Sequence, residues 1–480
     1  MKKRFFIVCS GFLSIVISIN CFSQQKLTPE FKVGIAKVSI NPDTSLINNN
    51  KIWLAGFMKR RTATGIHDTL WVNAMVFDNG QKKVCLIVID AIGLMRDDVV
   101  DIRNRIDGAH LGINHVIISS THTHSAPDLI GFSGPNPLKS GVNQGYLNFV
   151  KQKCVQATKD ALNNEQSAYL KLSIIDTIPV DIVVDERPPI IIDKSIYLMQ
   201  IVDRKTNKPF GILMNFGIHP HALDAENALI TSDFCHYWRK GIENGIVYNN
   251  KLIREGIGAT AIFANGAMGG HITTHGSNTY DPWLDTNFTK SGFEKSMTIG
   301  NKLADIVLQE IQEGNWAIVN NPEIRFQERK FLLEIQNKRM IGIDTLGIIN
   351  RKFIDSKFIE TEISLLTIGP AWILTIPGEI YPETLIGGIE NPDGADFTEN
   401  PVEVPPIRHL MSGEYNFVIG LANDAIGYII PKTLWDKDAP YAFGKPFHEE
   451  ETSIGPDASS KIYSEIKKMI EEYNYINSGR

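Results

Sequence analysis

Two histidines follow a short apolar segment in the stretch HVIISSTHTHSAPD, which runs from His115 to Asp128. The residues HVIISS are typical of a buried strand, and side chains two positions apart on a strand point to the same side. His122 and His124 should therefore project together from the end of this strand. Two imidazoles on one side suit a metal site or an acid/base site, although a polar turn would also explain them.

A second histidine pair has the same placement. The strand-like segment GILMNFG, residues 211–217, leads to His219, and His221 follows two residues later. Pro220 between them cannot continue regular strand pairing because it has no backbone N–H. Four of the twelve histidines thus gather at the ends of two predicted strands, a concentration that core filling alone does not explain. The two pairs together predict a functional site.

Three acidic or phenolic residues also follow strand-like segments. Glu379 stands in ILTIPGEIYPET, where Pro377 and Gly378 end a strand before a predicted helix. Its carboxylate is a candidate third metal ligand, but a favourable charge at the first turn of the helix is a simpler explanation. Tyr428 in NDAIGYIIP, taken alone, would be a core tyrosine with a hydrated hydroxyl. Asp90 ends KKVCLIVID and either orients one of the histidines or simply ends a strand.

Strands and helices must position these residues. The chain alternates between strand-like and helical segments. Strands are predicted where β-branched and aromatic residues lie between turn residues, over residues 31–40, 70–78, 82–90, 115–120, 169–175, 196–202, 211–217, 259–265, 324–335, 363–369 and 371–378. Helices are predicted over Asp97–Ile106, Gly145–Leu162, Phe234–Val247, Phe293–Gln312, Pro382–Ile389 and Ser459–Tyr473. This mixed order predicts an α/β fold with more than one sheet layer. Long loops, which tend to build or rim a site, are expected at Val180–Lys194, His275–Gly292 and Asn391–Arg408.

Several segments resemble those of the neutral (non-lysosomal) ceramidase family and occur in the same order. They are VGIAKVSINPDT, GIHDTLWVNAMVFD, VIISSTHTHSAPD, NFGIHPHAL, SDFCHYWRKGIE, IPGEIYPET and GYIIP followed by SIGPDA. The resemblance covers the chain from Phe31 to about Ile462, and THTHSAPD is its most specific part. It implies a zinc amidohydrolase with stacked β-sheets flanked by helices.

The same resemblance implies a particular set of zinc ligands. In the family, zinc is held by a histidine of the THTH segment, a histidine of a His-Pro pair, a glutamate in a Pro-Gly-Glu turn and a late tyrosine. The matching positions here are His122, His219, Glu379 and Tyr428. His124 matches a residue close to the substrate or the attacking water, and Tyr441 matches a tyrosine near the substrate amide with a slightly different spacing. This donor set suits Zn²⁺.

The loop FANGAMGGHITTH, Phe263–His275, departs from the family pattern. Ceramidases have Asn-x-Gly-Asp-x-Ser-Pro there, and the serine takes part in catalysis; its counterpart here is Ile272, while the aspartate matches Gly270. Shifting the match by one residue offers Thr273 instead. The family's C-terminal immunoglobulin-like domain also has no counterpart. The zinc ligands are therefore expected to be kept, and the residues that face the substrate only in part. Replacements for the lost hydroxyl would come from the loop backbone N–H groups or from His221, His271 and Tyr441.

These features predict a zinc-dependent hydrolase that cleaves an amide (N-acyl) or ester bond in a small-molecule, lipid-derived or glycan-derived substrate. Zinc lowers the pKa of a bound water from about 15.7 to about 7 and polarises a carbonyl. The catalytic candidates are His124, Tyr441, Asp90 and His221. Two alternatives stay open: a deacetylase or lactonase that uses the same zinc site on a sugar-derived substrate, and a ligand-binding homologue without catalytic activity.

The N-terminal residues have the pattern of an export signal, with MKKR, the apolar segment FFIVCSGFLSIVISI and CFS before Gln24. We expect residues 1–23 to be a removed signal peptide and residues 24–480 to form one periplasmic or secreted domain. Cys21 raises the alternative of lipid attachment, but Asn20 stands where such signals prefer a small residue. No later segment is long and apolar enough to span a bilayer. The net charge of -6 argues against nucleic-acid binding, which needs a basic surface.

Overall fold

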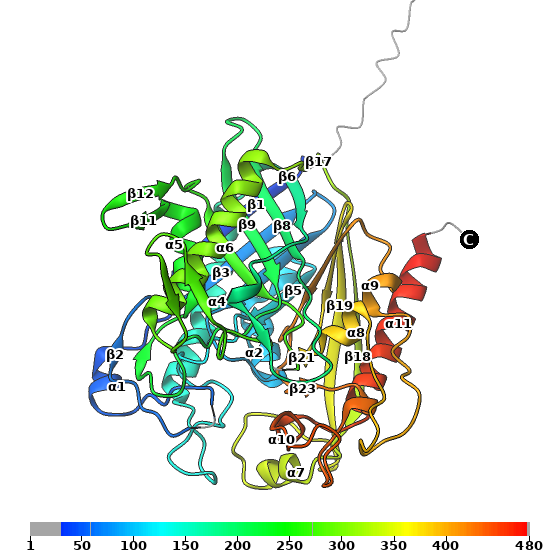
Figure 1. Cartoon of the computed structure of the whole chain (residues 1–480). Coiled ribbons are helices and arrows are strands. Elements are labelled where there is room, and N and C mark those ends of the chain that lie inside the picture. The colour runs from blue at the N-terminus through cyan, green and yellow to red at the C-terminus, as the bar shows by residue number, and fades with distance from the viewer. Residues whose placement is uncertain (1–29, 58, 271, 478–480) are drawn as a thin grey trace, which may run out of the picture.

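The computed structural model describes residues 30–57, 59–270 and 272–477. The predicted signal peptide and His271 lie outside these residues. Over the described part, the chain forms two stacked β-sheets with helices on their outer sides (Figure 1). This arrangement confirms the predicted α/β fold of stacked sheets flanked by helices.

The larger sheet has nine strands in the order β13-β9-β8-β6-β1-β3-β4-β5, with β17 paired to β6. Its strands are β1 (Lys32–Ser39), β3 (Trp71–Asp78), β4 (Lys83–Ile89), β5 (His115–Ser120), β6 (Gln166–Ile175), β8 (Ile196–Asp203), β9 (Pro209–Phe216), β13 (Thr260–Asn265) and β17 (Ala317–Val319). A parallel pair lies at each end of this order, β4 with β5 and β9 with β13. Strands buried on both faces explain the continuous apolar runs of these segments.

The second sheet has the order β18-β19-β20-β22. Its strands are β18 (Ile324–Glu334), β19 (Phe358–Ile368), β20 (Ala371–Thr375) and β22 (Tyr415–Ile419). One hydrophobic cluster joins the sheets, in which Leu86 and Leu213 of the first sheet pack with Leu366 and Phe417 of the second. The inner faces of the two sheets therefore share one core.

Helices cover the outer faces of both sheets. On the first sheet, α2 (Arg96–Ile106) and α4 (Gln144–Asn163) cover one part, and α5 (Phe234–Asn244) and α6 (Phe293–Glu313) cover another. On the second sheet, α11 (Ala458–Asn477) lies along the outer face, shown in red in Figure 1. The predicted helix from Phe234 was too long: α5 ends at Asn244, because Gly245 takes a left-handed φ of 97° and a strand follows.

Shorter elements connect these layers. The short strands are β2 (Gly65–Ile66), β7 (Val184–Asp185), β10 (Leu229–Ile230), β11 (Ile246–Tyr248), β12 (Lys251–Arg254), β14 (Ile272–Thr273), β15 (Thr279–Asp281), β16 (Thr286–Phe288), β21 (Glu379–Ile380) and β23 (Tyr428–Ile429). The short helices are α1 (Thr44–Asn48), α3 (Gly108–Leu111), α7 (Lys338–Thr345), α8 (Pro382–Ile386), α9 (Ile407–Leu410) and α10 (Glu449–Thr452), with 3₁₀ turns at Val180–Ile182 and Lys432–Leu434. None of the helices in the described ranges is long and apolar enough to cross a membrane.

The ends of three strands meet at one place. Asn265, the last residue of β13, donates hydrogen bonds to the carbonyls of Thr121 after β5, at 3.0 Å, and of Ile218 after β9, at 2.9 Å. The segment after β22 joins them, because the side chain of Asn423 accepts a hydrogen bond from the backbone N–H of Ile118 at 2.9 Å. Both predicted histidine pairs leave the first sheet at this junction.

Candidate metal centre

His122 and His219 follow β5 and β9 and face each other. Their ring centres are 5.0 Å apart, and both side chains are buried. His122 has a left-handed φ of 68°, which is uncommon for a residue with a side chain and is found most often at functional sites. The backbone therefore turns sharply at the strand end to direct this imidazole inwards.

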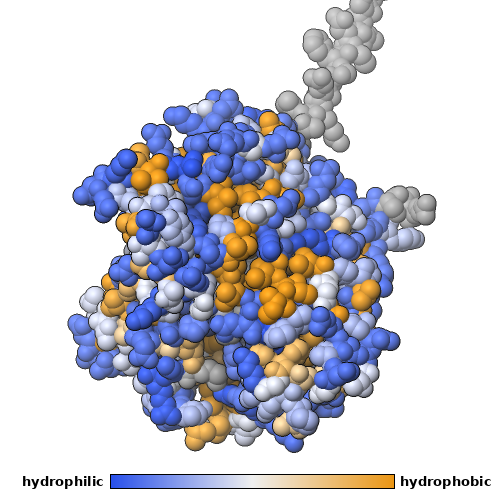
Figure 2. Space-filling model, viewed as in Figure 1, coloured by the Kyte–Doolittle hydropathy of each residue, from blue (hydrophilic) through white to orange (hydrophobic). Residues whose placement is uncertain are grey.

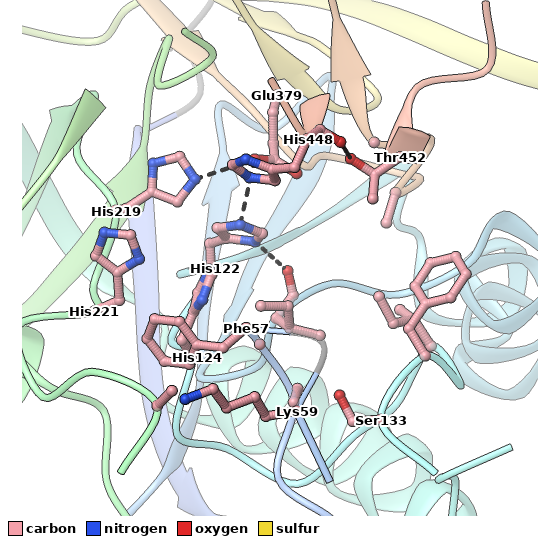
Figure 3. Close-up of a pocket in the computed structure, with 18 of the residues that line it drawn as sticks. Phe57, Lys59, His122, His124, Ser133, His219, His221, Glu379, His448 and Thr452 are labelled. Carbon is pink, nitrogen blue, oxygen red and sulfur yellow. Dashed lines mark hydrogen bonds and ion pairs between the residues drawn. The ribbon is translucent and has the colours of Figure 1, made fainter. Parts of the chain in front are cut away.

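Backbone carbonyls fix the orientation of both rings. Nδ1 of His122 lies 2.6 Å from the carbonyl oxygen of Ile92, and Nδ1 of His219 lies 2.8 Å from that of Ile272. A carbonyl only accepts, so Nδ1 carries the proton that each ring donates to its carbonyl. Metal-binding histidines are commonly oriented in this way. Both Nε2 atoms face the carboxylate of Glu379 (Figure 3).

Glu379 and Tyr428 follow the second sheet in the chain and lie side by side in a separate two-stranded sheet. They pair directly between the two-residue strands β21 and β23. A Cβ at Gly427 would lie 1.8 Å from the carbonyl oxygen of Thr452, and its φ is 81°, so only glycine fits there. Oε2 of Glu379 lies 3.1 Å from Nε2 of His219 and 3.5 Å from Nε2 of His122.

The four predicted ligands therefore converge. The hydroxyl of Tyr428 lies 3.5 Å from Nε2 of His219. Burial alone would raise the pKa of Glu379, but His122 and His219 outweigh it and hold that pKa well below its usual range. Burial and then Glu379 raise the pKa of Tyr428 well above its usual value. The site thus contains an ionised carboxylate, two imidazoles that direct Nε2 towards it and a phenol that needs a nearby cation to ionise.

The second histidine of each pair extends the cluster. The rings of His124 and His221 are 4.9 Å apart, and His124 also contacts His122 at 4.8 Å between ring centres. Both ring nitrogens of His124 are buried and have no hydrogen-bond partner among the residues that the structure describes. Burial, followed by the charges of His122 and His221, lowers the pKa of His124 well below its usual value. Phe57 covers this pair, stacking on His221 with ring centres 5.6 Å apart.

The cluster forms the floor of a pocket of about 480 Å³. Its apolar lining includes Ile92, Ile130, Phe132, Leu421 and Ala425. Its polar lining includes Lys59, Glu186, Asp224, His275 and His448. On the face shown in Figure 2, hydrophobic side chains are exposed among polar ones, both in the middle and around a hollow below it. A substrate with one apolar and one polar part would match this pocket.

Two predicted catalytic residues are not placed at the cluster. Asp90 does not orient a histidine, because its carboxylate pairs with Arg239 at 3.0 and 2.8 Å and accepts the backbone N–H of Trp71 at 2.9 Å. The buried Arg239 takes up the charge of Asp90, whose position at a strand end is therefore structural. Tyr441 is not among the residues that line the pocket. His124 and His221 are the predicted catalytic residues that the structure brings to the centre.

The loop that departs from the ceramidase pattern supports the cluster from behind. The side chain of Ile272 packs in a hydrophobic cluster, and its carbonyl holds His219 as described above. The hydroxyl of Thr273 accepts the backbone N–H of His275 at 2.9 Å. Ile272 therefore supplies backbone support and no hydroxyl, and Thr273 uses its own hydroxyl within the loop.

Some pocket residues had no sequence motif to identify them. His448 precedes α10 and contacts the ring of Tyr428 edge to face, with ring centres 5.8 Å apart. His275 also lines the pocket, although it was not among the predicted site residues. His275 and Glu186 come from two of the long loops that were expected to build the site. The length of its loop was therefore the one sequence feature that indicated a role in the site for His275. No sequence feature indicated such a role for His448.

The chain is similar to known proteins in its structure but not detectably in its sequence. No family model matches the chain, and no curated protein matches it. The neutral ceramidase from Pseudomonas aeruginosa superposes with a TM-score of 0.69 at 14% identity, over 92% of this chain and 74% of the ceramidase. A ceramidase complexed with C2 gives a TM-score of 0.67 at 14% identity, over 92% and 75% of the two chains. The chain therefore has the fold of neutral ceramidases, in a divergent form.

Proposed function

We propose that the protein is an exported zinc-dependent hydrolase that cleaves an amide (N-acyl) bond in a substrate with an acyl chain and a polar part. One observation carries the proposal: two imidazoles whose Nδ1 atoms are held by carbonyls direct Nε2 at an ionised carboxylate beside a buried phenol. Export rests on the N-terminal sequence pattern.

The donor set fits Zn²⁺, with His122, His219, Glu379 and Tyr428 as ligands. A cation would also offset the cost of burying Glu379 and would supply the positive charge that Tyr428 needs to ionise. When bound, zinc supplies a water with a pKa near 7 and polarises the attacked carbonyl.

The chain's own residues orient the substrate. Ile92, Ile130 and Phe132 offer an apolar surface for an acyl chain, which would place the amide over the histidines on the pocket floor. His124 and His221 would act on the carbonyl oxygen, in place of the hydroxyl that Ile272 cannot provide. A single donor of this kind is typically worth about 2.7–4 kcal/mol in the transition state.

A deacetylase or lactonase acting on a sugar-derived substrate is the second candidate. The polar lining of the pocket, with Lys59, Glu186 and Asp224, favours it because a sugar needs several hydrogen-bonding groups. It would use the same metal ligands and leave the apolar lining partly unused. A homologue that only binds its ligand would keep the pocket and lack turnover.

The test uses protein purified without an affinity tag and loaded with zinc. Long-chain ceramide, a long-chain N-acyl amino acid, an N-acetylated amino sugar and a lactone are offered with and without 1,10-phenanthroline. We expect fatty acid release from a long-chain amide, inhibited by the chelator. His122→Ala should lower the rate more than about 100-fold, since even residues that only orient a ligand cost about 10–100-fold.

His115→Ala is the matched control, because His115 is also a buried histidine beside a carboxylate but lies outside the pocket. It should keep the activity. Turnover of the sugar or the lactone alone would replace the proposal by the second candidate. A zinc-loaded protein that turns over none of the four substrates would support the ligand-binding homologue instead.

A further inference from the structure

The second histidines of the two pairs repeat the geometry of the first. His122 and His219, the first of each pair, have ring centres 5.0 Å apart with planes at 66°. His124 and His221 have ring centres 4.9 Å apart with planes at 82°. Two imidazoles bound to one zinc at a near-tetrahedral angle place their ring centres about 5 Å apart. Both pairs therefore have the separation of histidines that share a cation.

His124 lacks another explanation for its burial. Both of its ring nitrogens are buried without a hydrogen-bond partner in the described part of the chain. A buried polar group without a partner costs roughly 1–3 kcal/mol. A Cβ on Gly56 would lie 2.7 Å from Nδ1 of His124, so the chain passes closely over that side of the ring. The ligand atoms of His122, His124 and His219 nevertheless lie within 4.8 Å of one another, at metal-binding range.

The charges around the pocket favour more than one cation. Its lining includes the carboxylates of Asp128, Glu186, Asp224 and Glu379, and one lysine, Lys59. Glu379 belongs to the first cation. Asp128 is occupied by the backbone N–H groups of residues 130, 131 and 133. Asp224 and Glu186 remain on the same side as His221.

Those two carboxylates reach the cluster through His275. Nε2 of His275 lies 3.7 Å from Oδ2 of Asp224, and Nδ1 lies 3.6 Å from Oε1 of Glu186. The ring of His275 is 6.3 Å from that of His221, with planes at 78°. Histidine nitrogens and carboxylate oxygens therefore lie close to His221.

Arg61 lies near His124, and three backbone carbonyls hold its charge. Its guanidinium donates to the carbonyls of Ala55 and His124, both at 2.6 Å, and of Asn227 at 2.7 Å.

We propose that this chain binds a second divalent cation beside the first, held by His124 and His221 with Asp224 or His275 completing the set. The inference rests on the proposed function for the first cation and goes beyond it, because the four ligands of that cation do not include His124 or His221. Paired cations about 3.5–4 Å apart can stabilise the charges that develop during hydrolysis. The second cation would then act on the carbonyl oxygen in place of the two histidines that hold it.

The experiment measures metal stoichiometry and needs no substrate. Untagged protein is stripped with a chelator, dialysed against Zn²⁺ or Co²⁺, and its bound metal is measured by mass spectrometry. Titration with Co²⁺, followed by visible absorption, gives the two binding steps. We expect two equivalents per chain in the wild type and one in His124→Ala and in His221→Gln. His409→Ala, at an exposed histidine outside the pocket, should keep two.

The outcomes separate this inference from the proposed function. One equivalent in the wild type overturns the second site and leaves the first intact. No bound metal overturns both. Two equivalents that persist in His124→Ala and in His221→Gln would place the second cation elsewhere and also overturn the inference. Near-UV circular dichroism of each stripped variant confirms that it is folded, and His221→Gln provides the test if His124→Ala is not.

Discussion

Two clusters in this molecule have metal-binding groups within reach of one another, and they differ in what surrounds them. One is the centre of His122, His124 and His219, and the other consists of His115, Glu328 and Glu362. In the first, the imidazole Nε2 atoms face Glu379 and the pocket. In the second, the fully buried Glu362 already forms ion pairs with Arg96 at 2.5 Å and with Arg103 at 2.7 Å.

The difference shows that suitable donor atoms are not sufficient for a metal site. Arg96 and Arg103 supply the positive charge that Glu362 needs, so a cation would be repelled there. Burial and then Arg103 lower the pKa of His115 to about 4, so the ring is neutral and hydrogen-bonds Ser364. At the first cluster, the partners of Glu379 are His122 and His219, and no arginine pairs with it in the described part of the chain. The missing arginine distinguishes the candidate metal centre from the second cluster.

The largest expected effect comes from Glu379→Gln, which removes the negative charge from the first cluster. Bound zinc should fall by one equivalent per chain, and hydrolysis should fall more than about 100-fold. Elemental analysis and the hydrolysis assay measure both. Normal zinc content in this variant would show that the carboxylate is not a ligand. The proposed difference between the two clusters would then be wrong.

The corresponding change at the second cluster, Glu362→Gln, should leave metal content unchanged and lower stability. Two buried arginines would lose their partner, and breaking a buried ion pair in this way typically costs about 3–5 kcal/mol. Urea denaturation monitored by tryptophan fluorescence gives the change in the free energy of unfolding. A loss of zinc in the folded variant would mean that the two clusters are coupled.

Zinc bound at the first cluster should stabilise the protein. A ligand at 100 times its Kd adds about 2.7 kcal/mol to the free energy of unfolding. The midpoint of thermal denaturation should therefore rise with zinc in the wild type and in His115→Ala, and rise less in Glu379→Gln. Scanning calorimetry with and without zinc distinguishes these cases.

Glu383 sharpens the comparison, because it has neither histidines nor a close arginine partner. Burial raises its pKa from 4.5 to about 8, so the folded protein keeps it protonated at neutral pH while the unfolded chain ionises it. Its contribution to stability is therefore fully present below pH 4.5 and is lost as pH rises to about 8. Within that window it should lower stability by up to about 1.4 kcal/mol per pH unit.

Glu383→Gln should remove this slope, since an amide does not titrate. Urea denaturation at several pH values between 5 and 8.5 gives the slope for each protein. Equal slopes in the wild type and the variant would contradict the assignment.

The sequence predicted the strands that carry the ligands, because buried strands read as apolar runs and end at polar residues. Histidines at two such ends, and Glu379 in a Pro-Gly turn, were therefore identifiable as candidates. Tyr428 needed the resemblance to ceramidases, since one tyrosine after a glycine carries little local information. The structure brings all four together, as that resemblance implied.

The other features of the site depend on contacts between segments that are distant in the sequence. Local sequence patterns do not predict such contacts. The role of Asp90 was mispredicted because its partner, Arg239, lies on α5 and has no motif of its own. Phe57 and His448 reach the pocket from loops without regular structure. The long loops were recognised, but which of their residues would turn inwards depends on packing that the sequence does not specify.

The ligands of the first centre are divided between the sheets: His122 and His219 leave the first, and Glu379 and Tyr428 follow strands of the second. The four ligands come together only after the segment with Tyr428 has paired with β21. The metal would therefore bind in the last step of folding. An exported chain would then acquire its cation in the compartment where it folds. Since metal availability decides selectivity as much as affinity does, the identity of the bound ion would reflect the supply of that compartment.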